Sequence, residues 1–175
     1  MNARQIFNGF LSSAWLVAAP ALAADELPVP QHLSAASDTD SAPILLAGRR
    51  YAAFWNTGDP RYARIALSPD FMDRTLPPGR PQGPSGPLAA SAAFRAAVPD
   101  LSAEMEDVVI AGDRISIRFH FRGHFTGQMG TLSGEGQVID FQAFDIYRVS
   151  DGVIAENWHL EDNLTFKQQL GLIAR

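Results

Sequence analysis

Asp145 is the first residue whose type and setting suit proton transfer. It falls within a predicted strand over residues 137–149, on the face that alternation assigns to Ile139, Phe141, Ala143, Tyr147 and Val149. An acid on such an apolar face lies in a pocket, pairs with a buried Arg or His, or is turned outward by a bulge. Arg118 and Arg148 are the candidate arginine partners.

Asp162 is the second candidate acid, and it follows a predicted strand over residues 153–160. In a regular strand it shares a face with Ile154, Trp158 and Leu160. A carboxylate beside an aromatic wall loses hydration, which raises its pKa and favours proton transfer near neutral pH. Alternatively, Asp162 is the N-cap of a helix predicted over residues 163–172, and it can fill both roles.

The histidines give a weaker pattern. His120 alternates with apolar residues on a polar strand face, and His159 points away from Trp158 if the strand is regular. For each, an ordinary surface or hydrogen-bonded role is the alternative. No two histidines share a ligand spacing with a carboxylate, so we predict no metal site. The chain has no cysteine, which excludes disulfides, thiolate catalysis and cysteine-ligated zinc.

Several apolar side chains are candidates for the wall of a substrate pocket, with plain core packing as the alternative for each: Trp55, Phe71, Met72, Phe144 and Trp158. Asn56 either donates a hydrogen bond to a substrate oxygen or helps to end its helix. Arg74 and Arg80 flank a Pro- and Gly-rich segment over residues 76–87. That segment is either a lid over the pocket mouth or a simple exposed loop.

The elements that must position these residues are segregated along the chain. Apolar spacing predicts helices over residues 44–56, 61–67 and 88–98. Alternation then predicts strands over residues 105–110, 115–121, 137–149 and 153–160, with Asp151-Gly152 as a hairpin turn and a final helix over residues 163–172. Helices followed by a meander of strands indicate an α+β fold.

Length and charge narrow the class of protein. The 175 residues predict one domain. The net charge is −5 and no Lys/Arg run is present, so the sequence lacks the basic patch that is typical of a nucleic-acid binder.

The pattern of residues 1–23 predicts a secretory signal peptide, with Arg4, an apolar run over residues 10–19 and Ala21-Leu22-Ala23. A retained anchor or an apolar first helix is the alternative. We expect a flexible Pro-, Ser- and Ala-rich lead over residues 24–43, a domain over residues 44–175, and a periplasmic or secreted protein without stable membrane insertion after cleavage.

An ordered set of motifs resembles a known family. It closes with Asp145-Ile146-Tyr147-Arg148-Val149-x-Asp151-Gly152-x-Ile154-x-Glu156-x-Trp158-x-x-x-Asp162 and Gln169-Leu170-Gly171. It also contains Gly123-His124-Phe125-Thr126-Gly127 and Phe54-Trp55-Asn56-Thr57-Gly58-Asp59. Over residues 44–172 the set resembles the SnoaL-like polyketide cyclases.

This resemblance implies the nuclear transport factor 2-like fold, in which helices wrap a curved antiparallel sheet into a cone that holds a ligand, and in which homodimers are common. It implies that Asp162 is the general acid and base of an aldol ring closure. It also implies that His124 polarises a carbonyl or orients Asp162, although a surface role is the alternative. The fold hosts many reactions, so it does not fix this one.

The leading hypothesis is cofactor-independent acid–base chemistry on a small, largely apolar carbonyl compound. Asp162 would be the base and His124 or Asn56 the electrophilic helper. The second hypothesis is a periplasmic module that binds an apolar or amphipathic ligand without converting it, with Asp162 only a cap. The third is a dimerisation or scaffold domain with a filled cone. Export sets this chain apart from cyclases that act where polyketides are built, which puts a polyketide substrate in question.

Overall fold

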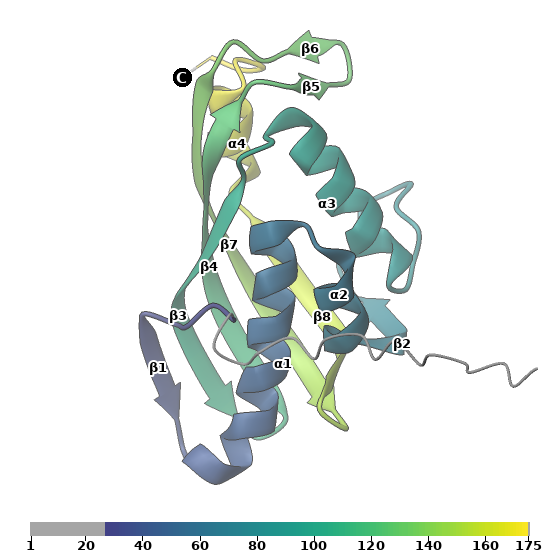
Figure 1. Ribbon diagram of the computed structural model, residues 1–175, viewed down its shortest axis with the longest axis vertical. Helices are drawn as coiled ribbons and strands as arrows, with labels where there is room; N and C mark the ends of the chain where they lie inside the picture. Colours follow the sequence, from purple (N-terminus) through teal and green to yellow (C-terminus); the bar gives the residue numbers. More distant parts are fainter. Residues whose placement is uncertain (1–26, 175) are drawn as a thin grey trace, which may run out of the picture.

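A six-stranded curved sheet with helices against one face organises the protein (Figure 1). The computed structural model describes residues 27–174. Its sheet has the order β1-β3-β4-β7-β8-β2. Its strands are β1 (His32–Ala35), β2 (Leu67–Asp73), β3 (Ser102–Ala111), β4 (Arg114–Phe125), β7 (Gln137–Ser150) and β8 (Val153–Glu161).

Within the described residues, four helices accompany the sheet: α1 (Asp38–Thr57), α2 (Pro60–Ala66), α3 (Ser85–Ala97) and α4 (Asn163–Gln169). The first three lie in front of the sheet in Figure 1, and α4 lies beside the far end of β7. β3, β4, β7 and β8 form an antiparallel meander, while β1 and β2 add parallel edges. The expected α+β class, with helices wrapping a curved sheet and a short C-terminal helix, is confirmed. No helix of residues 27–174 is both long enough and apolar enough to cross a membrane.

The hydrophobic core fills the space between α1 and the inner face of the meander. Alternate residues of β4 and β7 are buried there, as the period-2 pattern requires, and they meet Tyr51 and Phe54 of α1. At the opposite end Phe166 of α4 stacks on Phe94 of α3, with ring centroids 5.0 Å apart. Phe141 stacks on Phe121 at 5.3 Å. These aromatic contacts close one end of the molecule and hold α3 and α4 against the sheet.

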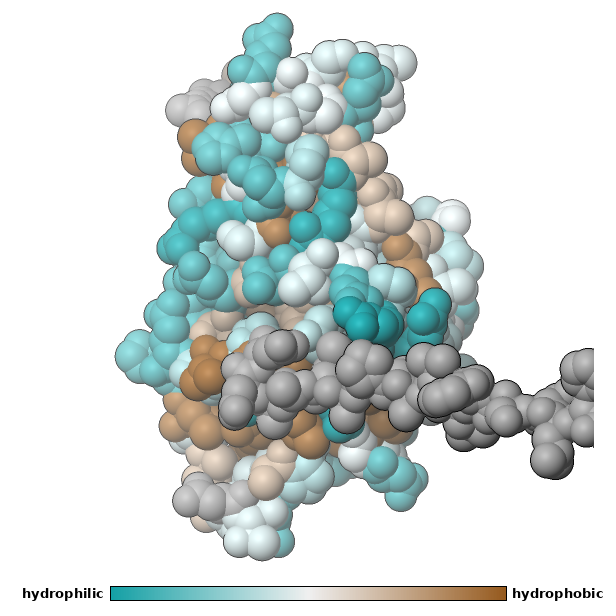
Figure 2. All heavy atoms as spheres, viewed as in Figure 1, coloured by the Kyte–Doolittle hydropathy of each residue, from teal (hydrophilic) through white to brown (hydrophobic). Residues whose placement is uncertain are grey.

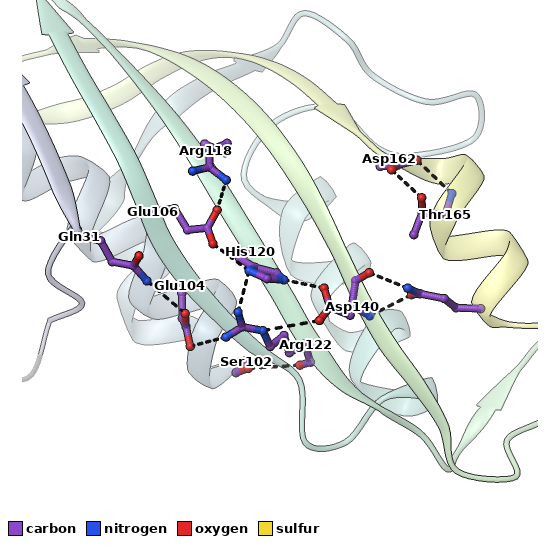
Figure 3. Close-up of polar contacts among 11 residues, drawn as sticks. Gln31, Ser102, Glu104, Glu106, Arg118, His120, Arg122, Asp140, Asp162 and Thr165 are labelled. Carbon is purple, nitrogen blue, oxygen red and sulfur yellow. Dashed lines mark hydrogen bonds and ion pairs between the residues drawn. The ribbon is translucent and has the colours of Figure 1, made fainter.

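The outer face of the sheet carries a network of charged side chains, shown in Figure 3. His120 contacts Glu106 through Nδ1 at 2.9 Å and Asp140 through Nε2 at 2.6 Å. Arg118 pairs with Glu106 and Asp107. His120 therefore lies on the polar face that the alternation of β4 predicts, away from the core.

A β-bulge in β8 changes which side chains face the core. The turn after β7 pairs Ser150 with Val153 and Val149 with Ile154, but Arg148 pairs with Glu156. Ala155 is thus an extra residue without a register partner on β7. Because successive strand residues point to opposite faces, this one insertion reverses the alternation of everything beyond it.

The N-terminal part of the described chain is more ordered than expected. Residues 27–43 fall within the expected flexible lead, yet they include β1 and the first turns of α1. Leu27 is buried, and Arg49 donates hydrogen bonds to the carbonyls of Pro28 at 2.7 Å and Leu27 at 2.9 Å. Figure 2 shows hydrophobic atoms gathered in the lower half of the molecule, above a pale lower tip. The predicted signal peptide lies outside the described residues.

Two helices begin earlier than predicted, and one connection contains a hairpin that was not predicted. α1 begins six residues before the predicted start, because Ser37 caps it and Pro43 removes only one backbone hydrogen bond in its second turn. α3 likewise begins early, with Pro87 tolerated in its first turn. The Gly-rich connection over residues 127–136 contains a small hairpin of β5 (Gln128–Met129) and β6 (Leu132–Ser133).

Candidate active site

An interior pocket lies between α1, α3 and the inner face of β4, β7 and β8. The centres of water-sized molecules can occupy about 80 Å³ of it, and its empty space is about 700 Å³ when the open solvent at the mouth is included. Its wall is half aromatic and apolar and half polar. The lining residues are Tyr51, Trp55, Asp73, Arg80, Pro87, Ala90, Phe94, Leu101, Phe121, Phe141, Asp145, Asn157, His159 and Glu161.

A carboxylate–histidine–carboxylate chain crosses the polar wall. Asp145 Oδ1 lies 2.8 Å from His159 Nδ1, and His159 Nε2 lies 3.4 Å from a carboxylate oxygen of Glu161. Asp145 and His159 are directly opposite one another on β7 and β8, so the sheet itself sets their separation. Asp145 is only 4% exposed, which makes His159 its buried partner.

The charges in this chain depend on one another. Burial of the imidazole opposes its protonation, but hydrogen bonds to Asp145 and Glu161 outweigh that effect and raise the pKa of His159 to about 10. Burial likewise opposes ionisation of Glu161, and the contact with His159 nevertheless lowers the pKa of that carboxyl. Near neutral pH the site therefore holds an imidazolium beside carboxylates, an acid and a base in contact.

Tyr51 and Asn157 add neutral hydrogen-bonding groups to the pocket. Burial, together with the charge of Asp145, raises the pKa of Tyr51 far above its ordinary value, so Tyr51 stays a phenol that can donate. Asn157 follows the β8 bulge and is 6% exposed. Its side-chain oxygen is buried without a hydrogen-bond partner among the described residues.

The segment between β2 and α3 brings Arg80 to the pocket. Gln82 fixes this segment to β2, because its side-chain amide accepts from Asp73 N at 2.8 Å and donates to Asp73 O at 3.0 Å. Asp73, in turn, accepts from the backbone and hydroxyl of Thr75. Of the two arginines that flank the predicted loop, Arg80 lines the pocket and Arg74 pairs with Glu156 at 2.9 Å outside it.

Asp162 lies elsewhere, and the assignment of its face from strand alternation is wrong. It caps α4, accepting from Thr165 N at 3.0 Å and Thr165 Oγ1 at 2.7 Å (Figure 3). These hydrogen bonds lower the pKa of Asp162. The bulge at Ala155 is the cause, since beyond it Trp158, Leu160 and Asp162 face outward. The cap was the alternative interpretation of this residue, and the capping geometry is what the structure shows.

Of the other predicted site residues, Asp145 and Trp55 line the pocket. His124 is on the surface, 2.7 Å from Asp100. The Asn56 side chain accepts from Ala103 N at 3.0 Å and holds α1 against β3. The other four predicted wall residues do not line this pocket. Phe71 is buried in the core, Met72 is exposed, and Trp158 lies under Arg114 on the outer face. Phe144 is exposed and lines a separate hollow with Asp162.

Sequence reasoning missed the polar residues of β8 because it counted the hairpin as regular. Regular pairing from the Asp151-Gly152 turn puts Asp145 opposite Trp158, whereas the bulge puts it opposite His159. A usable signal was present: Asn157, His159 and Glu161 alternate with Trp158 and Leu160. That alternation fits a strand whose polar side faces a pocket as well as one whose apolar side faces a core.

Comparison with known proteins agrees with this architecture. The sequence profile of the SnoaL-like polyketide cyclases matches residues 45–170, which is well over half of the chain. The protein belongs to the SnoaL-like polyketide cyclase family. The resemblance noted from the motifs is thereby confirmed, and with it the nuclear transport factor 2-like fold.

Solved structures of the family align over nearly their whole length. A Bacillus cereus ATCC 10987 protein provisionally described as a polyketide cyclase is 41% identical, with a TM-score of 0.77 over 85% of this chain and 96% of its own. TsrD from Streptomyces laurentii is 29% identical, with a TM-score of 0.69 over 77% of this chain and 98% of its own. IdmH from Streptomyces antibioticus, also provisionally described as a polyketide cyclase, is 28% identical, with a TM-score of 0.64 over 75% and 98%. Among proteins with curated descriptions, none matches.

Proposed function

We propose that this SnoaL-like protein performs cofactor-independent acid–base chemistry on a small carbonyl compound, with Asp145 as base and His159 as acid. The observation that carries the proposal is the contact of 2.8 Å between these two side chains inside the pocket. It replaces the pair predicted from sequence, because Asp162 and His124 lie outside the pocket.

The chemistry follows from the charges of the pair. A carbon–hydrogen bond next to the substrate carbonyl breaks, its proton passes to Asp145, and the electron pair forms an enolate. Protonated His159 and the phenol of Tyr51 are donors that stabilise the enolate oxygen. The contact of His159 Nε2 with Glu161 is long, at 3.4 Å, so a substrate oxygen can compete for this nitrogen.

Ring closure is the natural continuation in a molecule with two carbonyl groups. The enolate carbon bonds to the second carbonyl carbon, and the new alkoxide takes a proton from His159. His159 Nδ1, which contacts Asp145, keeps its own proton throughout. When the product leaves, Asp145 releases the first proton to solvent and His159 Nε2 takes one up from solvent, which restores the starting state. The aromatic wall of Trp55, Phe94 and Phe121 excludes water, which strengthens each of these electrostatic interactions. The names of the structural neighbours, which include polyketide cyclases, support this class of reaction.

The test measures deuterium incorporation, which reports enolisation without knowledge of the natural substrate. The probe is 1-tetralone in D₂O, and loss of its C2 proton signal is followed by NMR once pocket resonances of the protein have shown that the probe binds. We expect the wild-type protein to accelerate exchange, and Asp145→Asn and His159→Gln each to reduce that acceleration by about 10²-fold or more.

His124→Gln is the matched control, because His124 also pairs with an aspartate but lies outside the pocket. It should leave exchange unchanged, and so should Asp162→Asn. Exchange of the bound probe at the buffer rate, or wild-type rates in both pocket variants, would refute the proposal. Either result would leave the non-catalytic ligand-binding module as the better description.

Export and homodimer formation remain predictions beside this proposal. Export is tested by the size of the protein recovered from the periplasm or medium, where cleavage after Ala23 removes 23 residues. The oligomeric state is tested by light scattering of the purified protein.

A further inference from the structure

The pocket contains one polar group that the proposed chemistry does not use. Asn157 lines the pocket between Asp73 on β2 and Tyr147 on β7, its register partners on the two sides. Its side chain is more than nine-tenths buried, and the side-chain oxygen has no hydrogen-bond partner among the described residues. An unpaired buried acceptor costs stability, so it needs an explanation.

No donor among the described residues lies within hydrogen-bonding distance of this oxygen, and the buried hydroxyl of its register partner Tyr147 is likewise without a partner. The Asp73 carboxyl oxygen Oδ1 accepts from the backbone amide and from the hydroxyl of Thr75. Gln82, the nearest amide on the adjoining segment, is engaged with the Asp73 backbone through both of its polar atoms. The side-chain oxygen of Asn157 therefore has no donor, although the residue lines the pocket.

The position of Asn157 relative to the proposed catalytic pair sets what the donor must be. Asn157 and His159 are two residues apart on β8 and share the inner face, which separates their Cα atoms by about 7 Å. One small molecule can therefore reach both side chains. Its carbonyl would lie at His159 and its donor at Asn157, at opposite ends of a ring or fused pair of rings.

We infer that Asn157 is a specificity-determining residue that selects substrates carrying a hydroxyl group about one ring away from the reacting carbonyl. The substrate class is thus a hydroxylated ketone, such as a phenolic or polyhydroxylated ring compound, in place of a purely apolar one. A site built around an unpaired acceptor discriminates against a ligand that lacks the donor, because the acceptor then stays unpaired. This inference rests on the proposed function in taking the same pocket as the substrate site and in placing the substrate carbonyl at His159.

The experiment compares two probes that differ in one donor. 6-Hydroxy-1-tetralone has a ketone and a hydroxyl at opposite ends of its ring system, and 6-methoxy-1-tetralone replaces the donor by an ether. Dissociation constants come from protein NMR titrations of the full predicted mature chain. We expect the wild-type protein to bind the hydroxyl compound about tenfold or more tightly, and near-isosteric Asn157→Leu to abolish that preference.

A second readout separates a specificity role from a structural one. If Asn157 is unpaired in the free protein, Asn157→Leu raises the Tm of the ligand-free protein by about 2–4 °C. A structural asparagine would give a lower Tm instead. Ser91→Ala is the matched control, because the Ser91 hydroxyl is also buried and unpaired but does not line the pocket. It should leave the preference between the probes unchanged.

Equal binding of the two probes by the wild-type protein, or a preference that survives in Asn157→Leu, would overturn the inference. A lower Tm for Asn157→Leu would do the same. These measurements follow binding and stability, whereas the proposed function is judged on deuterium exchange. The inference and the proposed function can therefore fail separately.

Discussion

At the scale of single residues, the state of His159 decides what the pocket can do. Its imidazole carries a charge because two carboxylates overcome the effect of burial. His124 also contacts a carboxylate, Asp100, but both side chains are exposed. The two histidines thus differ in burial and in the number of carboxylates that they contact, and an ion pair gains strength where water is excluded.

This difference has a measurable dependence on pH. The folded-state pKa of His159, about 10, lies above the ordinary value of 6.5. Its contribution to stability is therefore complete below about pH 6.5 and is lost as the pH rises through about 10. Urea unfolding of the wild-type protein and His159→Gln should show a gap on the order of a few kcal/mol at pH 6 that narrows steadily towards pH 10. Parallel curves would mean that His159 is neutral in the folded protein.

At the scale of elements, regular patterns were predictable and their interruptions were not. Alternation located the four strands of the meander, because each has one face in the core and one in water. Asp145 was placed correctly on the inner face of β7 for the same reason. The bulge at Ala155 left no mark that composition could reveal, so the predicted inner face of β8 was inverted from that point on.

The early elements show a second limit of local patterns. β1 consists of four residues with mostly exposed side chains, so no apolar alternation identifies it. It exists because its backbone pairs with the edge of β3 and because Arg49 fixes the preceding segment. Such contacts join positions far apart in the sequence, and no window of neighbouring residues contains them.

The end of β4 packs against the end of α3, and this contact gives a testable prediction. The backbone amides of Thr126 and Gly127 both donate to the carbonyl of Ala97, which ties the end of β4 to the end of α3. A Cβ at Gly127 would lie 1.9 Å from the Ala96 carbonyl oxygen. Gly127→Ala should therefore destabilise the protein by about 1–3 kcal/mol, measured by urea unfolding. Glu135 is exposed and lies in the same connection between β4 and β7. Glu135→Ala should therefore leave the stability unchanged, and equal stability of the two variants would contradict this packing.

At the scale of the whole molecule, the folded unit extends beyond the family match. The SnoaL-like profile begins at residue 45, whereas Leu27, the first residue that the structure describes, is already buried. Leu27 is buried in the core, and β1 covers the edge of β3. The parallel β1 strand thus protects an edge that would otherwise expose unpaired backbone groups.

Truncation tests this boundary. A chain that begins at Ser37 keeps the cap of α1 but loses Leu27, β1 and the carbonyl partners of Arg49. Compared with a chain that begins at Ala24, it should be less stable by at least about 2 kcal/mol, chiefly from the lost burial of Leu27. Chemical denaturation of the two chains measures the difference. Equal stability would show that the segment before α1 contributes nothing to the fold.

The extra residue in β8 also has an evolutionary consequence. Deleting or inserting a single codon near Ala155 exchanges the whole set of side chains that the pocket receives from that strand, with no substitution at any of them. Trp158 and Leu160 would enter in place of Asn157, His159 and Glu161, turning a polar wall into an apolar one. A single-residue insertion or deletion in this strand can therefore convert a polar pocket suited to proton transfer into an apolar pocket suited to ligand storage, or the reverse. A sequence alignment would show this insertion or deletion only as a one-residue gap, although it changes every pocket-lining side chain of the strand.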